Sequence, residues 1–262
     1  MTQTLNIVAD AHIWGIESAC SELAGFDVDL QLLENSHITP ANLQQTDILL
    51  TRSATRVNAS LLENTPVRFA ATATIGDDHY DKHWLDNHNI NWANAAGSST
   101  GSVLEYMLTV LFALHQRDLI SLPNCTIGII GAGRIGSELA LLCEAMGLSV
   151  LLNDPPRARV EGGSDFYSLH EILAQSDILS LHTPLIADGI DCTHHLLNQV
   201  TLEQFKGRGI INAARGACVD NHALCDWLNA QSDRFAVLDC WEFEPTPLSG
   251  LLKHPQLTIA TP

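Results

Sequence analysis

A glycine-rich run between an apolar segment and a helical pattern is the part of this sequence that most directly predicts chemistry. Apolar residues 126–130 precede it, and the run itself reads Gly131-Ala132-Gly133-Arg134-Ile135-Gly136. In such a loop one glycine permits a tight turn, one lets backbone approach a pyrophosphate, and one lets a helix pack on the strand. The helix N-terminus adds free N–H groups and partial positive charge. The sequence therefore predicts a dinucleotide site that uses Gly131, Gly133, Arg134, Ile135 and Gly136.

Asp154 follows a second apolar run, residues 149–153, at the place where an acid would meet the ribose of a dinucleotide. A carboxylate there accepts hydrogen bonds from ribose hydroxyls and repels a 2′-phosphate, so NAD is favoured over NADP. Arg157 and Arg159 come shortly afterwards and count against that preference to a small extent. The alternative is an ordinary glycine-rich turn, which would not need the order of strand, loop, helix, strand and acid.

Alternating strand and helix patterns predict a doubly wound α/β protein with two domains. We expect a Rossmann NAD-binding domain over residues 98–262, with the flexible stretch 97–102 at the boundary. The second half contains six strand patterns, and we expect them in the order 3-2-1-4-5-6. They span residues 126–130, 149–153, 178–181, 209–212, 235–238 and 257–260.

Residues 1–97 are expected to form a smaller, flavodoxin-like substrate domain, because strands and helices alternate there too. The strands are predicted at residues 6–9, 28–33, 48–51, 69–73 and 90–93. The helices between them are predicted at residues 16–23, 40–45, 58–63 and 84–87.

Polar residues collect where the predicted strands of the second domain end. Thr183 follows the third strand, Arg215 the fourth and Asp239 the fifth. Ligands of open α/β sheets bind outside the carboxyl ends of the strands. We therefore expect one edge of this sheet to carry the cofactor motif, an arginine and carboxylates, although loops are polar in general.

Composition narrows the range of partners and compartments. The formal net charge of −17 argues against nucleic acid or an anionic membrane as a general partner. Seven cysteines without a CxxC pattern favour reduced thiols in the cytoplasm. No signal-peptide pattern begins the sequence, and the apolar stretch 103–114 is too short to cross a bilayer. Asp77-Asp78-His79 and His194-His195 lack the spacing of a metal-ligand set, so no metal is expected.

Several segments together resemble the D-2-hydroxyacid dehydrogenase family. Arg215 stands in residues 212–216, Glu244 stands in residues 239–245, and the glycine loop precedes both. Within the family, four further segments resemble the erythronate-4-phosphate dehydrogenase branch; they are residues 51–58, 71–79, 154–157 and 182–185. The resemblance covers nearly the whole chain. It implies NAD-dependent oxidation of a phosphorylated 2-hydroxy acid in vitamin B6 synthesis, and a homodimer in the complete protein.

The resemblance also implies roles for single residues. Arg215 would bind the substrate carboxylate and polarise the C2 oxygen, since a guanidinium binds carboxylates bidentately. Glu244 would orient a catalytic histidine that removes the hydroxyl proton. Ser53 and Thr74 match substrate-contacting positions, and Arg52 could bind the phosphate. Positions that contact the cofactor in the family are matched by Thr183, Ala213, Ala214 and Asp239.

Plainer interpretations of these residues stay open. Arg215 could be a structural surface arginine, and Glu244 could be a solvated carboxylate. Ser53 and Thr74 could cap helices. Arg52 could simply lie at an exposed strand end.

The family carries its catalytic histidine directly after a Thr-Pro pair that follows the sixth strand, and this sequence ends at Thr261-Pro262. The resemblance therefore predicts a C-terminally incomplete chain with little activity by itself. His182 and His254 are weaker candidates for the base, since a base must reach the substrate hydroxyl. Residues 95–100 depart from the family pattern, which leaves their role open. The alternative functions are another dehydrogenase of the family, such as a phosphoglycerate type, or a non-catalytic NAD-binding regulator.

Overall fold

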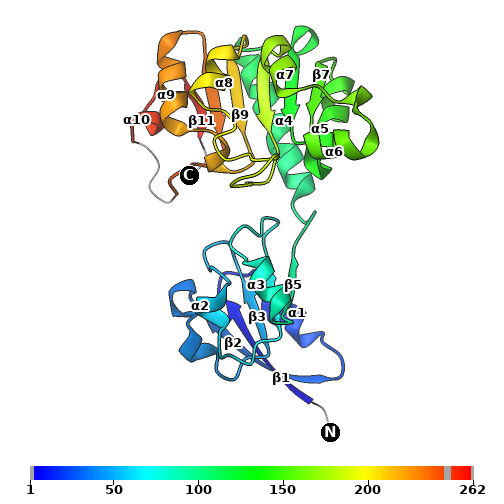
Figure 1. Ribbon diagram of the computed structural model, residues 1–262, viewed down its shortest axis with the longest axis vertical. Helices are drawn as coiled ribbons and strands as arrows, with labels where there is room; N and C mark the ends of the chain where they lie inside the picture. Colours follow the sequence, from blue (N-terminus) through cyan, green and yellow to red (C-terminus); the bar gives the residue numbers. More distant parts are fainter. Residues whose placement is uncertain (1–2, 245–248, 261–262) are drawn as a thin grey trace. The chain divides into compact units, whose positions relative to one another are not determined.

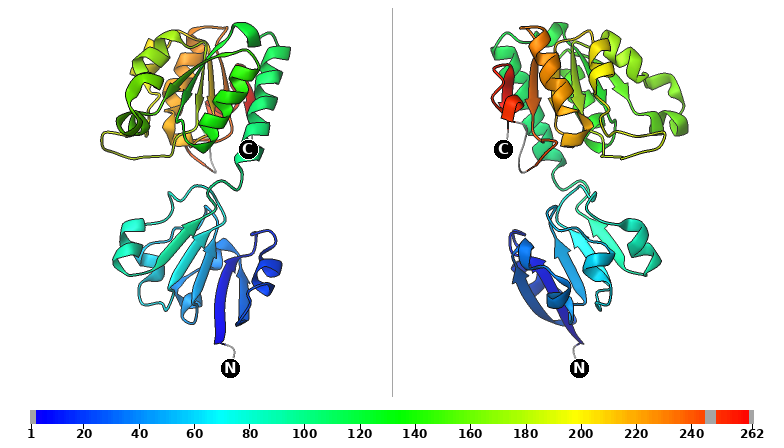
Figure 2. Two further views of the ribbon diagram at one scale, coloured as in Figure 1. Left: turned by 90° about the vertical axis from the view of Figure 1, so that its right-hand side faces the viewer. Right: turned by 60° about the vertical axis from the view of Figure 1, so that its left-hand side comes forward.

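The computed structural model describes residues 3–244 and 249–260 and divides the chain into two units, Met1–Ser99 and Thr100–Pro262. Each unit is a parallel β-sheet with helices on both faces (Figure 1 and Figure 2). No helix in these described ranges is long and apolar enough to cross a membrane.

The first unit has five parallel strands in the order β2-β1-β3-β4-β5, the order of the flavodoxin-like doubly wound fold. The strands are β1 (Gln3–Asp10), β2 (Phe26–Leu33), β3 (Ile48–Thr51), β4 (Phe69–Thr72) and β5 (Asn91–Asn94). The α-helices are α1 (Ile16–Ser21), α2 (Ala59–Leu62) and α3 (Lys82–Asn87). The predicted helix at 40–45 is a 3₁₀ turn, Pro40–Leu43, preceded by another at Asn35–His37.

Alternating side chains of the first sheet feed two separate cores, as a period of two requires. Leu5 and Ile7 pack with Cys20 of α1. Val8 and Leu49 belong to the larger core that α2 and α3 cover. Both faces of the central strands are therefore covered, whereas no residue of β2 or β5 is buried, and ligand-binding residues are expected in the loops at the strand ends.

The six strands predicted for the second unit are confirmed with the same bounds. They are β6 (Thr126–Ile130), β7 (Ser149–Asn153), β8 (Ile178–Leu181), β9 (Gly209–Asn212), β10 (Phe235–Leu238) and β11 (Leu257–Ala260). All pair in parallel in the order β11-β10-β9-β8-β6-β7.

The predicted order 3-2-1-4-5-6 of these six strands is wrong, because β8, the third, pairs with β6 and not with the outer side of β7. The place outside β7 is held by a short extended segment instead, in which the Tyr167 N–H donates to the Leu152 carbonyl at 2.7 Å. That segment is Phe166-Tyr167-Ser168, between a 3₁₀ turn that ends at Asp165 and α7, which begins at Leu169, so it is too short to form a strand. If the segment around Tyr167 is counted as the third strand, β8 becomes the fourth, and the sheet has the expected order 3-2-1-4-5-6 with one further strand at the end.

Helices of the second unit cover the sheet in two groups. The helices are α4 (Thr100–Gln116), α5 (Arg134–Ala145), α6 (Pro155–Glu161), α7 (Leu169–Gln175), α8 (Gln199–Gln204), α9 (Asn221–Ala230) and α10 (Ser249–Leu252). Single 3₁₀ turns lie at Leu122–Asn124, Gly163–Asp165 and Gly216–Cys218. One core joins α4 and α5 to the sheet, and a second joins α7, α8 and α9 to its other face (Figure 1).

The strand order creates a switch point between β6 and β8. The chain leaves β6 toward β7 on one side, whereas β8 begins the run of strands on the other side. Ligands of open α/β sheets bind outside the carboxyl ends of strands at such a point. The segments that follow β6 and β8 are therefore the first place to look for a site.

Candidate active site

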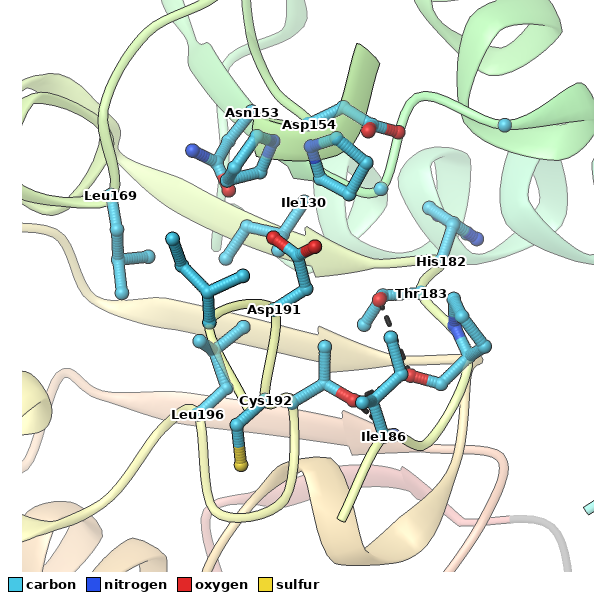
Figure 3. A pocket seen from close by; sticks show the side chains of 17 residues that line it. Ile130, Asn153, Asp154, Leu169, His182, Thr183, Ile186, Asp191, Cys192 and Leu196 are labelled. Atoms are coloured by element: carbon cyan, nitrogen blue, oxygen red, sulfur yellow. Dashed lines mark hydrogen bonds between the residues drawn. The ribbon is translucent and has the colours of Figure 1, made fainter. Parts of the chain in front are cut away.

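A cavity of about 330 Å³ lies at this switch point in the second unit. Its walls come from the glycine loop after β6, from Asp154 after β7, and from residues 182–196 after β8 (Figure 3). The walls are largely apolar, with a few polar groups that converge, as is usual for small-molecule sites. The apolar lining includes Ile130, Leu169, Ile186, Ile190 and Leu196, and the polar lining includes Asn153, Asp154, Asp191 and Thr193.

The glycines of the loop have the three geometries that a dinucleotide site needs. Gly131 has φ +93°, and a Cβ there would lie 2.7 Å from the carbonyl of His182. A Cβ on Gly136 would lie 2.0 Å from the Gly131 oxygen. A Cβ on Gly133 would meet no protein atom within 4 Å, so a ligand can approach its backbone closely.

The N-terminus of α5, where Arg134 and Ile135 form the first residues, faces the same loop. Gly133 occupies the N-cap position and offers no side chain to the orphan N–H groups. These donors and the helix dipole suit an anion such as a pyrophosphate. The residues present therefore fit the phosphate portion of NAD.

Asp154 ties the second strand to the glycine loop. Its Oδ2 accepts from the Ala132 N–H at 3.0 Å, and its Oδ1 accepts from the Arg157 N–H at 3.1 Å, which caps α6. A carboxylate oxygen can accept more than one hydrogen bond, so both can still accept from ribose hydroxyls. The predicted ribose-binding acid thus lines the cavity and also holds the loop.

The arginines that follow Asp154 are both engaged. Arg157 donates to both carboxylate oxygens of Glu161, at 2.7 and 2.8 Å, and to the Ala132 carbonyl. Arg159 pairs with Asp191 on the far wall of the cavity. Both guanidinium groups already have carboxylate partners, so neither is available to bind a 2′-phosphate next to Asp154. The argument that these arginines favour NADP is therefore weaker.

His182 ends β8 beside Gly131 and lines the cavity. Its Nε2 lies 2.8 Å from the Ser180 hydroxyl, while its Nδ1 is buried without a hydrogen-bond partner among the described residues. Burial lowers the pKa of His182 to about 4, so the ring is neutral near pH 7. Thr183 follows directly and also lines the cavity.

The loops after β9 and β10 carry the two predicted catalytic residues and lie in direct contact. The Asn212 side chain shapes the first loop: its Nδ2 donates to the Arg215 carbonyl, and its Oδ1 accepts from the Ala214 N–H. A Cβ on Gly216 would lie 1.9 Å from the Trp241 carbonyl. The two loops can therefore meet this closely only because residue 216 is a glycine.

Charged groups of both loops affect the half-buried Cys240 thiol. Burial raises the pKa of Cys240 to about 12; Asp239 and Glu244 raise it further, and Arg215 lowers it. All three charged groups thus lie near the same sulfur atom. Arg215 is half-buried, with one N–H donating to the Ala214 carbonyl, whereas Glu244 is exposed and accepts from the Trp241 N–H at 2.8 Å.

A histidine–carboxylate pair that the sequence did not predict lies close by. His195 Nε2 contacts Glu242 Oε1, and Glu242 Oε2 accepts from the Asn221 N–H at 3.0 Å at the start of α9. Neither His194-His195 nor the acids near Glu242 has a spacing that signals this pairing. Only the packing of the loops after β8 and β10 brings them together.

Ligand atoms of His194, His195 and Glu242 lie within 4.8 Å of one another, so the group was considered as a metal site. The two imidazole rings are stacked, with centroids 4.1 Å apart and planes 19° from parallel. Their in-plane lone pairs therefore run side by side and do not converge on one point. The geometry is that of a hydrogen-bonded pair with a stacked neighbour.

The predicted substrate residues lie on two loops at one edge of the first sheet. Arg52 and Ser53 follow β3 and are exposed. Thr74 follows β4; its hydroxyl contacts Thr72 Oγ1 at 2.7 Å and donates to the Gly76 carbonyl at 2.8 Å. Because β3 and β4 are parallel neighbours, both loops emerge at the same edge.

Residues at this edge also contact the 95–100 loop and the segment Asp77-Asp78-His79. The Ala95 N–H donates to the Thr74 carbonyl at 3.1 Å. Asp77 is satisfied by Lys82 at 2.7 Å and by the Asn94 amide at 2.9 Å. Its carboxylate therefore serves the loop structure.

The other predicted histidine, His254, has both ring nitrogens engaged. Nε2 lies 3.2 Å from Asn229 Oδ1, and Nδ1 accepts from the Gln256 N–H at 3.2 Å. These contacts argue against a role as general base. Thr261 and Pro262, which the resemblance places before the family's histidine, lie outside the described residues.

Comparison with known proteins agrees with this geometry. The chain is 43% identical to the erythronate-4-phosphate dehydrogenase of Pseudomonas syringae pv. syringae over 92% of its own length. It is 44% identical to the enzyme of that name from Chromohalobacter salexigens over 98% of its length. The chain spans 62% and 66% of the lengths of these two curated relatives.

Solved structures share the fold. The D-lactate dehydrogenase of Aquifex aeolicus, complexed with NAD and lactic acid, matches with a TM-score of 0.81 at 22% identity, over 97% of this chain and 87% of that one. The NAD-dependent formate dehydrogenase of Staphylococcus aureus matches with a TM-score of 0.77 at 23% identity, over 98% and 88%.

Residues 111–262 match the family model described as "D-isomer specific 2-hydroxyacid dehydrogenase, NAD binding domain". This match covers more than half of the 262 residues and contains the cavity, the glycine loop and both loops that meet at Gly216. The chain therefore belongs to the D-isomer specific 2-hydroxyacid dehydrogenase family and carries its NAD-binding domain.

Proposed function

We propose that the whole protein containing this chain oxidises the C2 hydroxyl of 4-phospho-D-erythronate with NAD, giving (R)-3-hydroxy-2-oxo-4-phosphooxybutanoate in the synthesis of pyridoxal 5′-phosphate. The observation that carries the proposal is the direct contact at Gly216 between the loop that carries Arg215 and the loop that carries Asp239 and Glu244, at strand ends of the sheet that bears the glycine loop. The substrate itself is supported by the relatives named erythronate-4-phosphate dehydrogenase.

NAD would lie along the carboxyl edge of the second sheet. The pyrophosphate would meet the loop from Gly131 to Gly136 and the first residues of α5, Arg134 and Ile135, while Asp154 would accept from the ribose hydroxyls. When bound, the nicotinamide accepts the hydride that leaves C2. Further cofactor contacts are assigned to Gly133, Thr183, Ala213, Ala214 and Asp239.

Arg215 would bind the substrate carboxylate. Its guanidinium stays charged at all relevant pH values and can form two parallel hydrogen bonds to a carboxylate. It stands in a chain with a net charge of −17, so a local cation is needed to hold an anionic acid at this edge. The same guanidinium would polarise the C2 oxygen as the C=O bond forms.

Glu244 would orient a histidine that takes the C2 hydroxyl proton. Family resemblance places that histidine after a Thr-Pro pair such as Thr261-Pro262. A carboxylate beside the ring favours the imidazolium and thereby raises its pKa. The hydroxyl proton would go to the histidine and the C2 hydride to the nicotinamide, which leaves the 2-oxo acid.

Arg52 is proposed to bind the phosphate end of the substrate. Arg52 supplies a positive charge, and Ser53 and Thr74 supply hydroxyl groups at the same edge of the first sheet. A guanidinium binds a phosphate bidentately, and the Ser53 hydroxyl would donate beside it. The Thr74 hydroxyl already donates to the Gly76 carbonyl and would have to leave that contact to donate to the substrate.

A cytoplasmic homodimer is proposed for the whole protein. All seven cysteines are free thiols, four of them buried, which fits a reducing compartment. Light scattering on the purified whole protein would give the mass of a dimer if this assignment holds.

The test is NADH formation by the whole protein, with 4-phospho-D-erythronate and 3-phosphoglycerate assayed side by side. A far higher kcat/KM on 4-phospho-D-erythronate supports the proposal. Preference for 3-phosphoglycerate would assign the protein to another activity of the same family. NAD binding without turnover on either acid would instead favour a regulator.

A further inference from the structure

The strongest unassigned feature is a second acidic side chain in the cavity at the switch point. Asp191 lies on the segment after β8 and lines the same cavity as Asp154. Figure 3 shows its carboxylate pointing into the cavity, toward the side that carries Asn153 and Asp154. The cavity therefore presents two carboxylates to whatever binds there.

The two oxygens of Asp191 have different surroundings. Oδ2 pairs with Nη2 of Arg159 on α6, and the two side chains are 24% and 48% exposed. Oδ1 is buried and has no hydrogen-bond partner within the described part of the chain. A buried carboxylate oxygen without a donor is costly, so this atom calls for a donor from a ligand.

The pairing also decides what Arg159 can do. In dehydrogenases that use NADP, an arginine near the acid position accommodates the 2′-phosphate. Arg157 is occupied by Glu161 and by the glycine loop, and Arg159, on the same helix, is the second arginine that follows Asp154. Asp191 neutralises this cation and adds a negative charge to the cavity.

We propose that Asp191 is a second determinant of the preference for NAD over NADP. Its buried oxygen accepts a hydrogen bond from a ribose hydroxyl or the adenine amino group, and its charge withholds Arg159 from a 2′-phosphate and repels that phosphate. The inference rests on NAD binding at this cavity, which belongs to the proposed function. The inference adds to the proposed function, because it assigns the preference for NAD to two side chains, Asp154 and Asp191, and not to Asp154 alone.

The experiment measures the dissociation constants of NAD and NADP by calorimetry, for the wild-type chain and for Asp191→Asn. We expect the variant to bind NADP about tenfold more tightly, because a like charge is removed and Arg159 is freed, while NAD binding weakens only a few-fold. Asp188→Asn is the matched control: Asp188 is exposed on the same segment and does not line the cavity, so both constants should stay unchanged.

Arg159→Gln separates this explanation from a loosened loop. Added to Asp191→Asn, this substitution should abolish the gain in NADP affinity. As a single substitution it should leave NADP binding as weak as in the wild-type chain. Equal weakening of both cofactors by Asp191→Asn, or a gain in NADP affinity that survives loss of Arg159, would overturn the inference. A wild-type chain that fails to bind NAD would overturn the proposed function as well. NAD binding with no change in NADP affinity for Asp191→Asn would overturn the inference alone.

Discussion

The imidazole of His195 and the carboxylate of Glu242 form a hydrogen-bonded pair that links the loop after β8 to the loop after β10. Glu242 also receives the Asn221 N–H at the start of α9, so one carboxylate ties together three segments. Its side chain is only 10% exposed. The segment that leads to Glu244 is therefore held from two sides.

Replacing His195 by alanine should destabilise this arrangement. Glu242 would keep one partner and lose the other in a mostly buried position, which costs about 1–3 kcal/mol of the free energy of unfolding. Urea denaturation measures the change. His194→Ala is the control: this stacked neighbour is exposed, so a loss within about 0.5 kcal/mol is expected. Equal losses for both variants would show that the His195–Glu242 hydrogen bond does not stabilise the fold beyond what an exposed histidine contributes.

Arg215→Gln should separate substrate binding from cofactor binding. Loss of the guanidinium would remove the proposed partner of the substrate carboxylate, and kcat/KM of the whole protein should fall roughly 100-fold or more. The dissociation constant of NAD, measured on this chain, should change by less than about twofold, because the contacts proposed between this loop and NAD come from Ala213 and Ala214 and not from the Arg215 side chain. Arg215→Lys should recover only part of the activity, since an ammonium cannot bind a carboxylate bidentately. A parallel loss of NAD affinity and turnover would instead indicate a structural role.

Asp154→Ala should lose both stability and NAD affinity. The carboxylate caps α6 and holds the Ala132 N–H, so about 1 kcal/mol of the free energy of unfolding should be lost. Removal of a charged acceptor from the ribose should raise the NAD dissociation constant about tenfold or more. Asp81→Ala is a matched control, because Asp81 caps α3 of the first unit in the same manner. It should reproduce the stability loss without any effect on NAD, and an effect of equal size on NAD would refute the ribose assignment.

His182 should make stability depend on pH. Burial lowers its pKa from 6.5 to about 4, so between these values the unfolded chain binds a proton that the folded chain does not. Stability is then fully present above about pH 6.5 and is lost as the pH falls toward about 4, by on the order of 3 kcal/mol. His182→Gln should flatten this part of the profile in urea denaturation across pH 4–7. The exposed His170→Gln should leave the profile as it is, and parallel wild-type and His182→Gln profiles would contradict the assignment.

The strands of the second unit could be predicted to the residue, because each is a short apolar run between polar loops and both faces of the sheet are buried. Their order could not. The segment at Tyr167 makes two hydrogen bonds to β7, one from its N–H to the Leu152 carbonyl and one from the Asn153 side chain to its own carbonyl. It is only three residues long, which is too short for its sequence to mark it as the third strand. Order depends on pairing between distant segments, which local periodicity does not encode.

Site residues could be predicted from the sequence where their role depends on the conformation of their own loop. Gly131 and Gly136 must be glycines for reasons that the loop itself contains, namely a positive φ and a close helix–strand approach. Asp191 and Glu242 escaped prediction because their partners, Arg159 and His195, lie on other segments of the chain. Side-chain pairs that form only through tertiary packing have no characteristic spacing in the sequence.

The close approach at Gly216 has a consequence for how this scaffold can diversify. Because there is no room for even one methyl group between the two loops, any side chain at position 216 would push the arginine-bearing and glutamate-bearing segments apart. If Arg215 and Glu244 act together as proposed, a change of substrate would be accommodated more easily in the loops after β3 and β4 than by any larger residue at position 216.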